Sequence, residues 1–398
     1  MKLSIYIIII YFFIASCSDH TVTSEKSFEK NNYKYKLSAS DTLIIPIDNS
    51  IVCWSRNKQV FYDTISKIKY LVRVNETSNI LEFFDLEKKS LSYKIKFDKE
   101  GPKGIGKLRG FYVHNIDSIF VNGAHKKKIW LFNYKGELKN IFDFRFNELT
   151  KDIGSFNCFT KNPLLFYNNK LNIPIIPNKD HDLTPELFYS DPIGFTYNLQ
   201  NDVVEICPIR YPELYNEDIY SSSGNIFFSR AYNPESEELV YSFPIDPFLY
   251  IIDKKGNIKK AKAKSEYFTK AEPMQNHNYD YQRRRRYYLE TPQYHYIIYD
   301  PYRQVYYRFC LLAINFNSKK TYHGFISLEM PATIIVLDNN FNTLVETKLP
   351  EKKLFFSKSF ITEEGLWLSN NSPLNPDFEE NQLSYTLFKL EKINRNEE

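Results

Sequence analysis

Hydrophobic residues along the chain fall in short apolar or alternating runs, and most of these runs end at an Asp or an Asn. Six examples are ILEFFDLEKKSL, IWLFNYKGEL, IGFTYNLQNDVV, LYIIDKKGNI, HYIIYDPYRQVYY and IIVLDNNFNTLV. Two alternating runs joined by a short polar turn indicate a β-hairpin. No long stretch combines a helical period with capping residues. The pattern therefore predicts an all-β fold.

The turn residues of these hairpins recur at intervals near fifty residues. Successive marks lie 48, 65, 55, 47 and 38 residues apart, at Asp85, Asn133, Asn198, Asp253, Asp300 and Asp338. A β-propeller gives such a repeat, because each four-stranded blade of roughly 40–50 residues must pack against its neighbours. Asp and Asn suit the turns since their side chains cap backbone N–H groups. Six marks predict six blades; seven blades remain open, and so does a β-sandwich with irregular spacing.

The two ends of the chain are expected to meet. The closing segment YTLFKLEKI, residues 385–393, has the alternation of a strand. We expect it to complete the ring with N-terminal strands near residues 42–62. Closure of this kind removes exposed sheet edges, which otherwise pair with other chains. The sequence thus predicts a single β-propeller domain over residues 39–398.

The first twenty residues, MKLSIYIIIIYFFIASCSDH, have the layout of a secretory signal peptide. Lys2 supplies a positive charge, an apolar run follows, and Ala15 and Ser16 are small. The apolar run is about twelve residues long, whereas a membrane-spanning helix needs roughly twenty. We therefore expect a signal peptide rather than a permanent transmembrane anchor.

The stretch Ile14-Ala15-Ser16-Cys17 resembles the lipobox of bacterial lipoproteins. That resemblance implies acylation of Cys17, and several acyl chains would give stable membrane anchoring. An ordinary cleaved signal with an incidental cysteine is the alternative. The predicted segments are a signal peptide over 1–16 and a lipidated cysteine with a flexible tether over 17–38. Ser18-Asp19 also resembles the acidic sorting signals of Bacteroidota-type surface lipoproteins, so the expected place is the outer membrane, periplasmic or surface-exposed.

Composition restricts the partners and cofactors. The chain has 52 basic and 48 acidic residues, a net charge of +4 that is too balanced to require nucleic acid. Its 31 Tyr and 32 Phe favour strands. The remaining cysteines lack any CxxC spacing, so we expect no metal site and no cofactor, and disulfides and buried free thiols stay equally open. These cysteines are Cys53, Cys158, Cys207 and Cys310.

The whole layout resembles the TolB-like six-bladed β-propeller lipoproteins of Bacteroidota type, many of which carry a domain of unknown function. The resemblance rests on the lipobox, on EGPKGIG at 100–106, on the LFNYKGEL-type hairpins and on DPYR at 300–303, which leads into VYYRF. It implies a six-bladed propeller in the cell envelope and assigns no activity.

Two stretches suggest ligand chemistry. GPKGIGKL, residues 101–108, matches the start of a phosphate-binding loop, but Leu108 stands where a Ser or Thr should hold magnesium, which argues against nucleotide binding. It is interpreted as a Gly-rich connection between blades, with the alternative that its amides line the central pocket. YDYQRRRRYY, residues 279–288, combines arginines with tyrosines. If it is a strand, Arg283 and Arg285 share one face, either as a solvated hairpin edge or as a site for an anion or a sugar.

The expected function is that of a monomeric envelope lipoprotein presenting a binding or scaffold module, anchored to the membrane by lipid and contacting a glycan, a peptide or another envelope protein. The alternative is a carbohydrate-active enzyme with acidic residues gathered in the central channel. Nucleic acid is not expected for an exported protein. The predicted ligand-binding residues are Arg283, Arg285, Tyr302, Arg303, Arg308 and Gly104.

Overall fold

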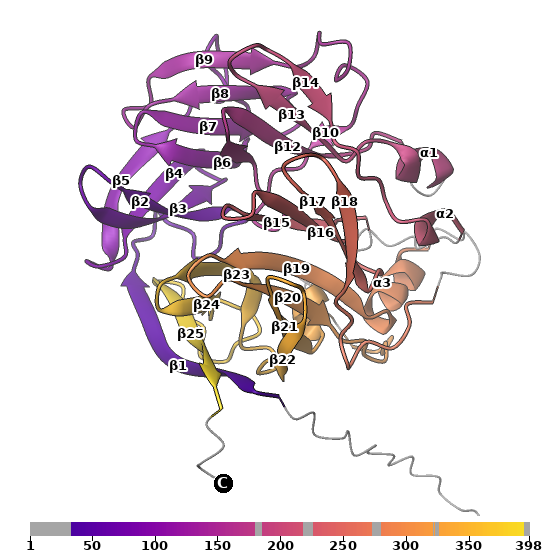
Figure 1. The fold of residues 1–398 in the computed structure, drawn as a ribbon. Coiled ribbons are helices and arrows are strands. Elements are labelled where there is room, and N and C mark those ends of the chain that lie inside the picture. Colours follow the sequence, from indigo (N-terminus) through magenta and orange to yellow (C-terminus); the bar gives the residue numbers. More distant parts are fainter. Residues whose placement is uncertain are drawn as a thin grey trace, which may run out of the picture. The chain divides into compact units, whose positions relative to one another are not determined.

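The computed structural model describes residues 33–179, 185–217, 226–272, 280–320, 322 and 326–393. The predicted signal peptide and Cys17 lie outside these residues. Within the described part, the strands form six antiparallel sheets set around a common centre, a six-bladed β-propeller (Figure 1). The predicted all-β propeller is confirmed, and so is the count of six blades.

The strands of blades 1 to 3 follow the chain from the innermost strand outward. Blade 1 comprises β2 (Lys58–Asp63), β3 (Ile68–Asn75), β4 (Ile80–Asp85) and β5 (Ser90–Lys96). Blade 2 comprises β6 (Leu108–Asn115), β7 (Ser118–Gly123), β8 (Lys128–Phe132) and β9 (Leu138–Asp143). In blade 3 the inner position is shared by β10 (Ser155–Phe156) and β11 (Leu165–Tyr167), followed by β12 (Lys170–Ile176), β13 (Gly194–Asn198) and β14 (Val204–Ile206).

Blades 4 and 5 repeat this order, and blade 6 departs from it. Blade 4 comprises β15 (Ser229–Asn233), β16 (Glu238–Ser242), β17 (Phe248–Ile252) and β18 (Ile258–Lys262). Blade 5 comprises β19 (Gln293–Asp300), β20 (Val305–Leu311), β21 (Ala332–Asp338) and β22 (Thr343–Lys348). Blade 6 takes β23 (Phe355–Thr362), β24 (Gly365–Ser369) and β25 (Gln382–Lys392) from the end of the chain and β1 (Tyr35–Pro46) from its beginning.

The pairing of β1 with β25 closes the ring. The two strands are antiparallel from Tyr35 opposite Lys392 to Pro46 opposite Gln382, with one bulge near residue 40, and they lie side by side in Figure 1. The predicted closure by residues 385–393 is confirmed, but the expected partner near 42–62 was placed too late in the chain: the partner is 35–46, and residues 58–63 form β2 of blade 1. Because β1 begins at Tyr35, the last four residues of the predicted tether belong to blade 6.

The turn residues cap backbone amides as predicted. Asp253 Oδ1, for example, accepts hydrogen bonds from Lys255 N at 2.8 Å and Asn257 N at 2.9 Å. Five of the six predicted turn residues lie in turns between the two outer strands of a blade, one in each of blades 1 to 5. The sixth, Asp300, lies in the turn between the two inner strands of blade 5. Blade 6 has no such outer turn because its outermost strand comes from the other end of the chain.

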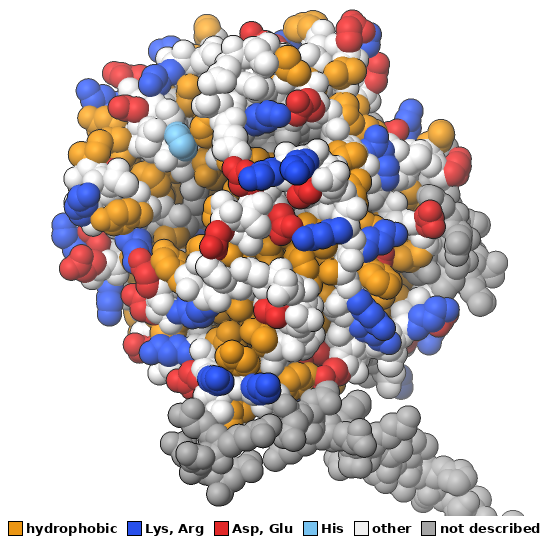
Figure 2. All heavy atoms as spheres, in the orientation of Figure 1, with side chains coloured by type: hydrophobic (Ala, Val, Ile, Leu, Met, Phe, Trp, Pro, Cys, Tyr) orange, Lys and Arg blue, Asp and Glu red, His pale blue; other side chains and the backbone are white. Residues whose placement is uncertain are grey.

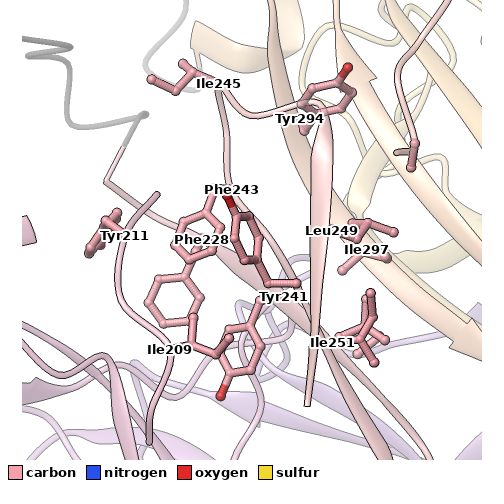
Figure 3. Packing of buried hydrophobic residues seen from close by; sticks show 14 of the residues in the cluster. Ile209, Tyr211, Phe228, Tyr241, Phe243, Ile245, Leu249, Ile251, Tyr294 and Ile297 are labelled. Carbon is pink, nitrogen blue, oxygen red and sulfur yellow. The ribbon is translucent and has the colours of Figure 1, made fainter. Parts of the chain in front are cut away.

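The core lies between the blades. Its largest cluster joins blades 3, 4 and 5 through aromatic residues, and Figure 3 shows Tyr211, Phe228, Tyr241 and Phe243 packed together beside Leu249 and Ile251 of β17. Tyr and Phe suit this role because the wide faces of two neighbouring sheets must be filled. The many aromatic residues of the sequence are used for packing between blades.

Buried arginines tie the blades together by hydrogen bonds to backbone carbonyls. Arg308 in β20 is fully buried and donates to Asp246 O at 2.7 Å, Ala263 O at 2.8 Å and Pro247 O at 3.0 Å, while its face lies over the Tyr294 ring at 3.5 Å. Arg230 in β15 donates to Pro163 O at 2.6 Å and to Asn172 of blade 3. A buried charge is tolerated when most of its donors are satisfied in this way, and of the donors of these two arginines only Arg230 Nε has no hydrogen bond to a described residue.

The helices in the described part of the chain are few and short. They are α1 (Pro185–Ser190), α2 (Leu214–Glu217), α3 (Tyr281–Glu290) and the 3-10 turn Ile326–Glu329. The strand-like alternation considered for the arginine-rich stretch was wrong, because Arg283 and Arg285 lie in α3, where Asp280 caps Gln282 N at 3.1 Å and Arg286 pairs with Glu290 at 2.9 Å. Arginine is a good helix former, and this pair is an i,i+4 contact. No described helix is long and apolar enough to cross a membrane.

The closing strand offers a direct test of ring closure. Ile45 in β1 is fully buried, whereas the neighbouring Ile44 is 45% exposed. We expect Ile45→Ala to lower the free energy of unfolding by about 2–5 kcal/mol, since it removes buried methylenes and leaves a cavity. Ile44→Ala, the matched control, should change it by less than about 1 kcal/mol. Urea denaturation of both variants measures this, and equal effects would contradict the role of β1 in the core.

Candidate functional site

A central cavity of about 450 Å³ runs between the innermost strands. All six blades line it: residues 57–60 come from blade 1, 111–112 from blade 2, 160 and 163–165 from blade 3, 230–232 and 234 from blade 4, 296–299 and 301 from blade 5 and 359–361 from blade 6. Its size is that of a small-molecule pocket, for which roughly 300–1,000 Å³ is usual. The axis of the propeller is therefore open enough for a ligand.

Basic side chains gather where the innermost strands begin. In a propeller of antiparallel meanders every innermost strand starts at the same face, so residues at these starts surround one mouth of the channel. Blade 1 supplies two of them and blades 2, 3, 5 and 6 supply one each. These residues, called the basic ring from here on, are Arg56, Lys58, Arg109, Lys161, His295 and Lys358. Lys58 is on the lining of the cavity, and the charges of the other five act on one another beside it.

Contacts between blades fix the base of the basic ring. Asn57 Nδ2 donates to Arg109 O at 3.1 Å and to Cys158 O at 3.0 Å, which joins blades 1, 2 and 3 at the mouth. Lys58 Nζ donates to Lys358 O at 2.9 Å and lies 5.0 Å from the centre of the Tyr385 ring, which joins blade 1 to blade 6. The ring is thus built on hydrogen bonds across the blade interfaces.

Two ammonium groups of the basic ring have no anionic partner in the described part of the chain. Lys358 Nζ lies over the Phe355 ring at 5.2 Å, and neither it nor Lys161 Nζ makes an ion pair or hydrogen bond with a described residue. Nearby, Glu76 pairs with Arg56 at 3.5 Å and with Lys107 at 3.4 Å. The local charge is therefore an excess of cations.

Several residues of the basic ring have lowered pKa values. Burial, together with repulsion from Arg56 and Lys161, lowers the pKa of Lys358 to about 7, and burial lowers the pKa of Lys161 to about 8. Burial and the two lysines also hold the pKa of His295 well below its usual value. Strongly perturbed groups that converge in a cleft mark a candidate functional site.

This chemistry suits an anion and not an acid pair. Among the described residues, no Asp or Glu lines the channel cavity. The described buried carboxyls with a raised pKa lie elsewhere: Glu82 in β4 pairs with Arg73 at 3.1 Å, and Glu346 in β22 accepts from Thr333 at 2.6 Å. The carboxylate pair expected for the carbohydrate-active alternative is therefore absent from the lining of this cavity.

The predicted ligand residues are spread over the molecule. Arg283 and Arg285 lie on α3, where Arg285 stacks over Tyr322 at 5.0 Å. Arg303 donates to Asp300 Oδ2 at 2.8 Å and to Thr362 O at 3.3 Å, so it fastens the β19–β20 turn to blade 6. Tyr302, half exposed, is on that same turn. None of these positions is on the lining of the channel cavity.

Arg308 and Gly104 also lie away from the channel cavity. Each nitrogen of the Arg308 guanidinium donates to a residue of blade 4 or of the β18–β19 connection, which makes it a tie between blades. Gly104 is in the loop between β5 and β6, where a side chain would meet the Glu100 backbone at 2.5 Å. The structure does not bring the six predicted ligand residues together. The cysteines Cys53, Cys158, Cys207 and Cys310 are all free thiols.

Comparisons with known proteins place the chain in a family. Residues 34–348 match the family model described as "Domain of unknown function (DUF4221)". The chain belongs to the DUF4221 family. A crystal structure of a DUF4221 member from Bacteroides vulgatus is similar to this chain at 26% identity with a TM-score of 0.81, over 91% of this chain and 99% of that one. The resemblance to Bacteroidota propellers with a domain of unknown function is thereby confirmed.

A second solved structure is similar to this chain in its fold. A putative exported protein from Bacteroides fragilis is 12% identical, with a TM-score of 0.53 over 91% of this chain and 96% of that one. No curated protein matches the chain. For this DUF4221 protein, the fold is thus shown by comparison and the site must be argued from its own residues.

The basic ring was missed from the sequence because its members are isolated there. Lys58, Lys161 and Lys358 stand in unrelated contexts, NKQ, TKN and SKS, about one hundred or two hundred residues apart. A signal did exist: in blades 1, 5 and 6 a basic residue is followed, two positions later, by an apolar residue, as in Lys58 and Val60. It becomes visible only after the innermost strands are aligned.

The lowered pKa of Lys358 has a consequence for stability. A lysine in the unfolded chain has a pKa near 10.4, so between about pH 7 and pH 10 the unfolded state binds a proton that the folded state has released. The buried charge of Lys358 therefore lowers the free energy of unfolding by its full amount below pH 7, and this destabilisation disappears as the pH rises towards 10. We expect Lys358→Gln to raise the melting temperature at pH 6 by a few degrees and to have a smaller effect at pH 9.5.

Differential scanning calorimetry at both pH values measures this effect. Lys96→Gln, an exposed lysine on the outer strand β5, is the matched control and should shift the melting temperature little at either pH. A Lys358→Gln variant that is less stable at pH 6 would contradict the model of an uncompensated charge.

Proposed function

We propose that this protein is an exported binding module that takes an anionic ligand into the mouth of its central channel. The single observation that carries the proposal is the basic ring. Six residues from five blades converge there, and the ammonium groups of Lys161 and Lys358 have no anionic partner among the described residues. A ligand anion would supply the missing partner.

Physical chemistry favours such a ligand. A hydrogen bond between an ammonium group and an anion is about twice as strong as a neutral one, and a channel wall excludes the water that would weaken it. Several cations from separate blades also fix the position of an anion from several sides. Protein stability is lowered by such a site in the empty state, which is the usual cost of a preformed binding site.

The cellular setting is part of the proposal. The exported relative from Bacteroides fragilis supports export, and the lipobox at residues 14–17 supports acylation of Cys17 and an outer-membrane location. A lipid anchor on the N-terminal side of β1 would hold blade 6 nearest the tether. The propeller would then present its channel to ligands of the envelope or the surroundings.

Citrate and inorganic phosphate serve as probes of the basic ring. We expect Lys161→Gln and Lys358→Gln each to weaken citrate binding by roughly tenfold or more, since a hydrogen bond to a charged group contributes about 1.5–3 kcal/mol. Isothermal titration of the folded domain, residues 33–398, measures the dissociation constant. Lys96→Gln changes the same charge on the outer strand β5 and should leave it unaltered.

The pH dependence separates this site from nonspecific attraction. Because the pKa values of Lys358 and Lys161 are about 7 and 8, citrate affinity should fall between pH 6 and pH 9 in the native protein, and less steeply in Lys358→Gln. Binding that is insensitive to both substitutions, or that persists equally in Lys96→Gln and the ring variants, would contradict the proposed function.

Acylation of Cys17 can be tested in cells. With Cys17 intact, we expect the protein to partition into the detergent phase of a Triton X-114 separation and to incorporate labelled palmitate. Cys17→Ser should shift it to the aqueous phase, because two acyl chains contribute most of the membrane affinity. Equal partitioning of both forms would indicate an ordinary signal peptide.

A further inference from the structure

Deeper in the channel than the basic ring, the side chains that line the wall change from basic to apolar. In blade 6, Lys358 is followed by Phe360 and Ile361, and in blade 5, His295 is followed by Ile298. Because each residue of a strand advances the chain by about 3.3 Å, these apolar residues lie up to about 10 Å deeper than the basic ones. The channel therefore has a basic mouth and an apolar interior.

All six blades contribute apolar atoms to this interior, blade 2 through Phe111. Half-buried Val60, Leu165, Tyr232 and Ile298 line the cavity together with Phe360 and Ile361. The ring of Tyr232 stacks on Tyr167 at 4.2 Å, which holds it against the wall. Apolar side chains that retain exposed area inside a cavity gain free energy when a ligand covers them.

Several polar groups of the same wall have partners within the protein, whereas Arg230 Nε, Tyr299 Oη and Ser359 Oγ are buried without a hydrogen bond to a described residue. Gln59 donates to Val113 O and accepts from Val113 N, both at 2.8 Å, so its amide satisfies the open edge of β6. Arg230 uses its terminal nitrogens on Pro163 and Asn172 of blade 3. Ile297 N donates to Ser229 Oγ at 3.0 Å. The Gln59 amide, the terminal nitrogens of Arg230 and Ile297 N are therefore not free to bind a ligand rich in hydroxyl groups.

We infer that the ligand is an amphiphile, a single-chain molecule whose anionic head binds at the basic ring and whose apolar body extends down the channel. This inference rests on the proposed function and adds the chemical class of the ligand. It also explains the order of the side chains along the innermost strands, because a head and a body of opposite polarity require a change of wall character within one pocket.

A series of straight-chain carboxylates tests the inference. Acetate, butyrate, hexanoate, octanoate and decanoate share one head group and differ only in the number of methylenes, and all are used below their critical micelle concentrations. We expect the affinity of the native domain to rise by roughly two- to fourfold for each added methylene until the channel is filled, and then to level off. Isothermal titration measures the series.

Two sets of variants assign the two ends of the ligand. Lys161→Gln should weaken decanoate binding by about tenfold or more. Leu165→Asn should reduce the gain per methylene while leaving citrate binding within about twofold of the native value, and Val60→Thr, which keeps the side-chain shape, serves where Leu165→Asn does not fold. Decanol and decyltrimethylammonium, which lack the anionic head, should bind at least tenfold more weakly than decanoate.

The outcomes separate the two proposals. If citrate binds through the lysines but affinity does not change with chain length, the amphiphile is wrong and the anion site stands. If affinity rises with chain length and is the same in Lys161→Gln, the chains bind elsewhere and the amphiphile is again wrong. If neither citrate nor any carboxylate depends on the basic ring, both proposals are overturned.

Discussion

The pairing of β1 with β25 is the contact on which the rest of this structure depends. Eleven residue pairs join the first and last described strands, and they make blade 6 from both ends of the chain. Without them blade 6 would consist of three strands from the end of the chain, the outer edge of β25 would be unpaired, and no strand pairing would join the two ends of the chain. The channel and its basic mouth exist only in the closed ring, because the side chains that form them belong to separate blades.

Arginine and lysine have different roles in this propeller. The buried arginines Arg230 and Arg308 send planar sets of donors to carbonyls of the neighbouring blade, and so they convert a buried charge into a tie between sheets. The lysines at the mouth have few acceptors and carry depressed pKa values. The arginines stabilise the interfaces among blades 3, 4 and 5, whereas the lysines come from blades 1, 3 and 6.

Much of the fold could be predicted from residues that act locally. The alternating runs and the Asp and Asn turns specify hairpins through neighbours in sequence, and the hydrogen bonds of Asp253 show the mechanism directly. The arginine-rich segment was misassigned as a strand because helix α3 depends on Asp280 and Glu290 at its ends and on the burial of Leu289, which a short polar stretch does not reveal. Propensity and capping outweighed the apparent alternation.

The site could not be predicted in the same way, because its members share no local motif. Lys58, Lys161 and Lys358 become neighbours only after six blades have closed, and the arginine-rich segment that attracted attention in the sequence lies on a helix outside the channel lining. A run of charged residues that stands out in a sequence is often exposed to solvent. A single lysine at the start of an innermost strand does not stand out, but the propeller topology places it beside lysines of other blades. An excess of charge held near the axis lowers stability in the empty protein, and packing alone gives no reason to keep it there. This loss of stability arises at the mouth of the channel, where a bound anion would compensate the positive charge.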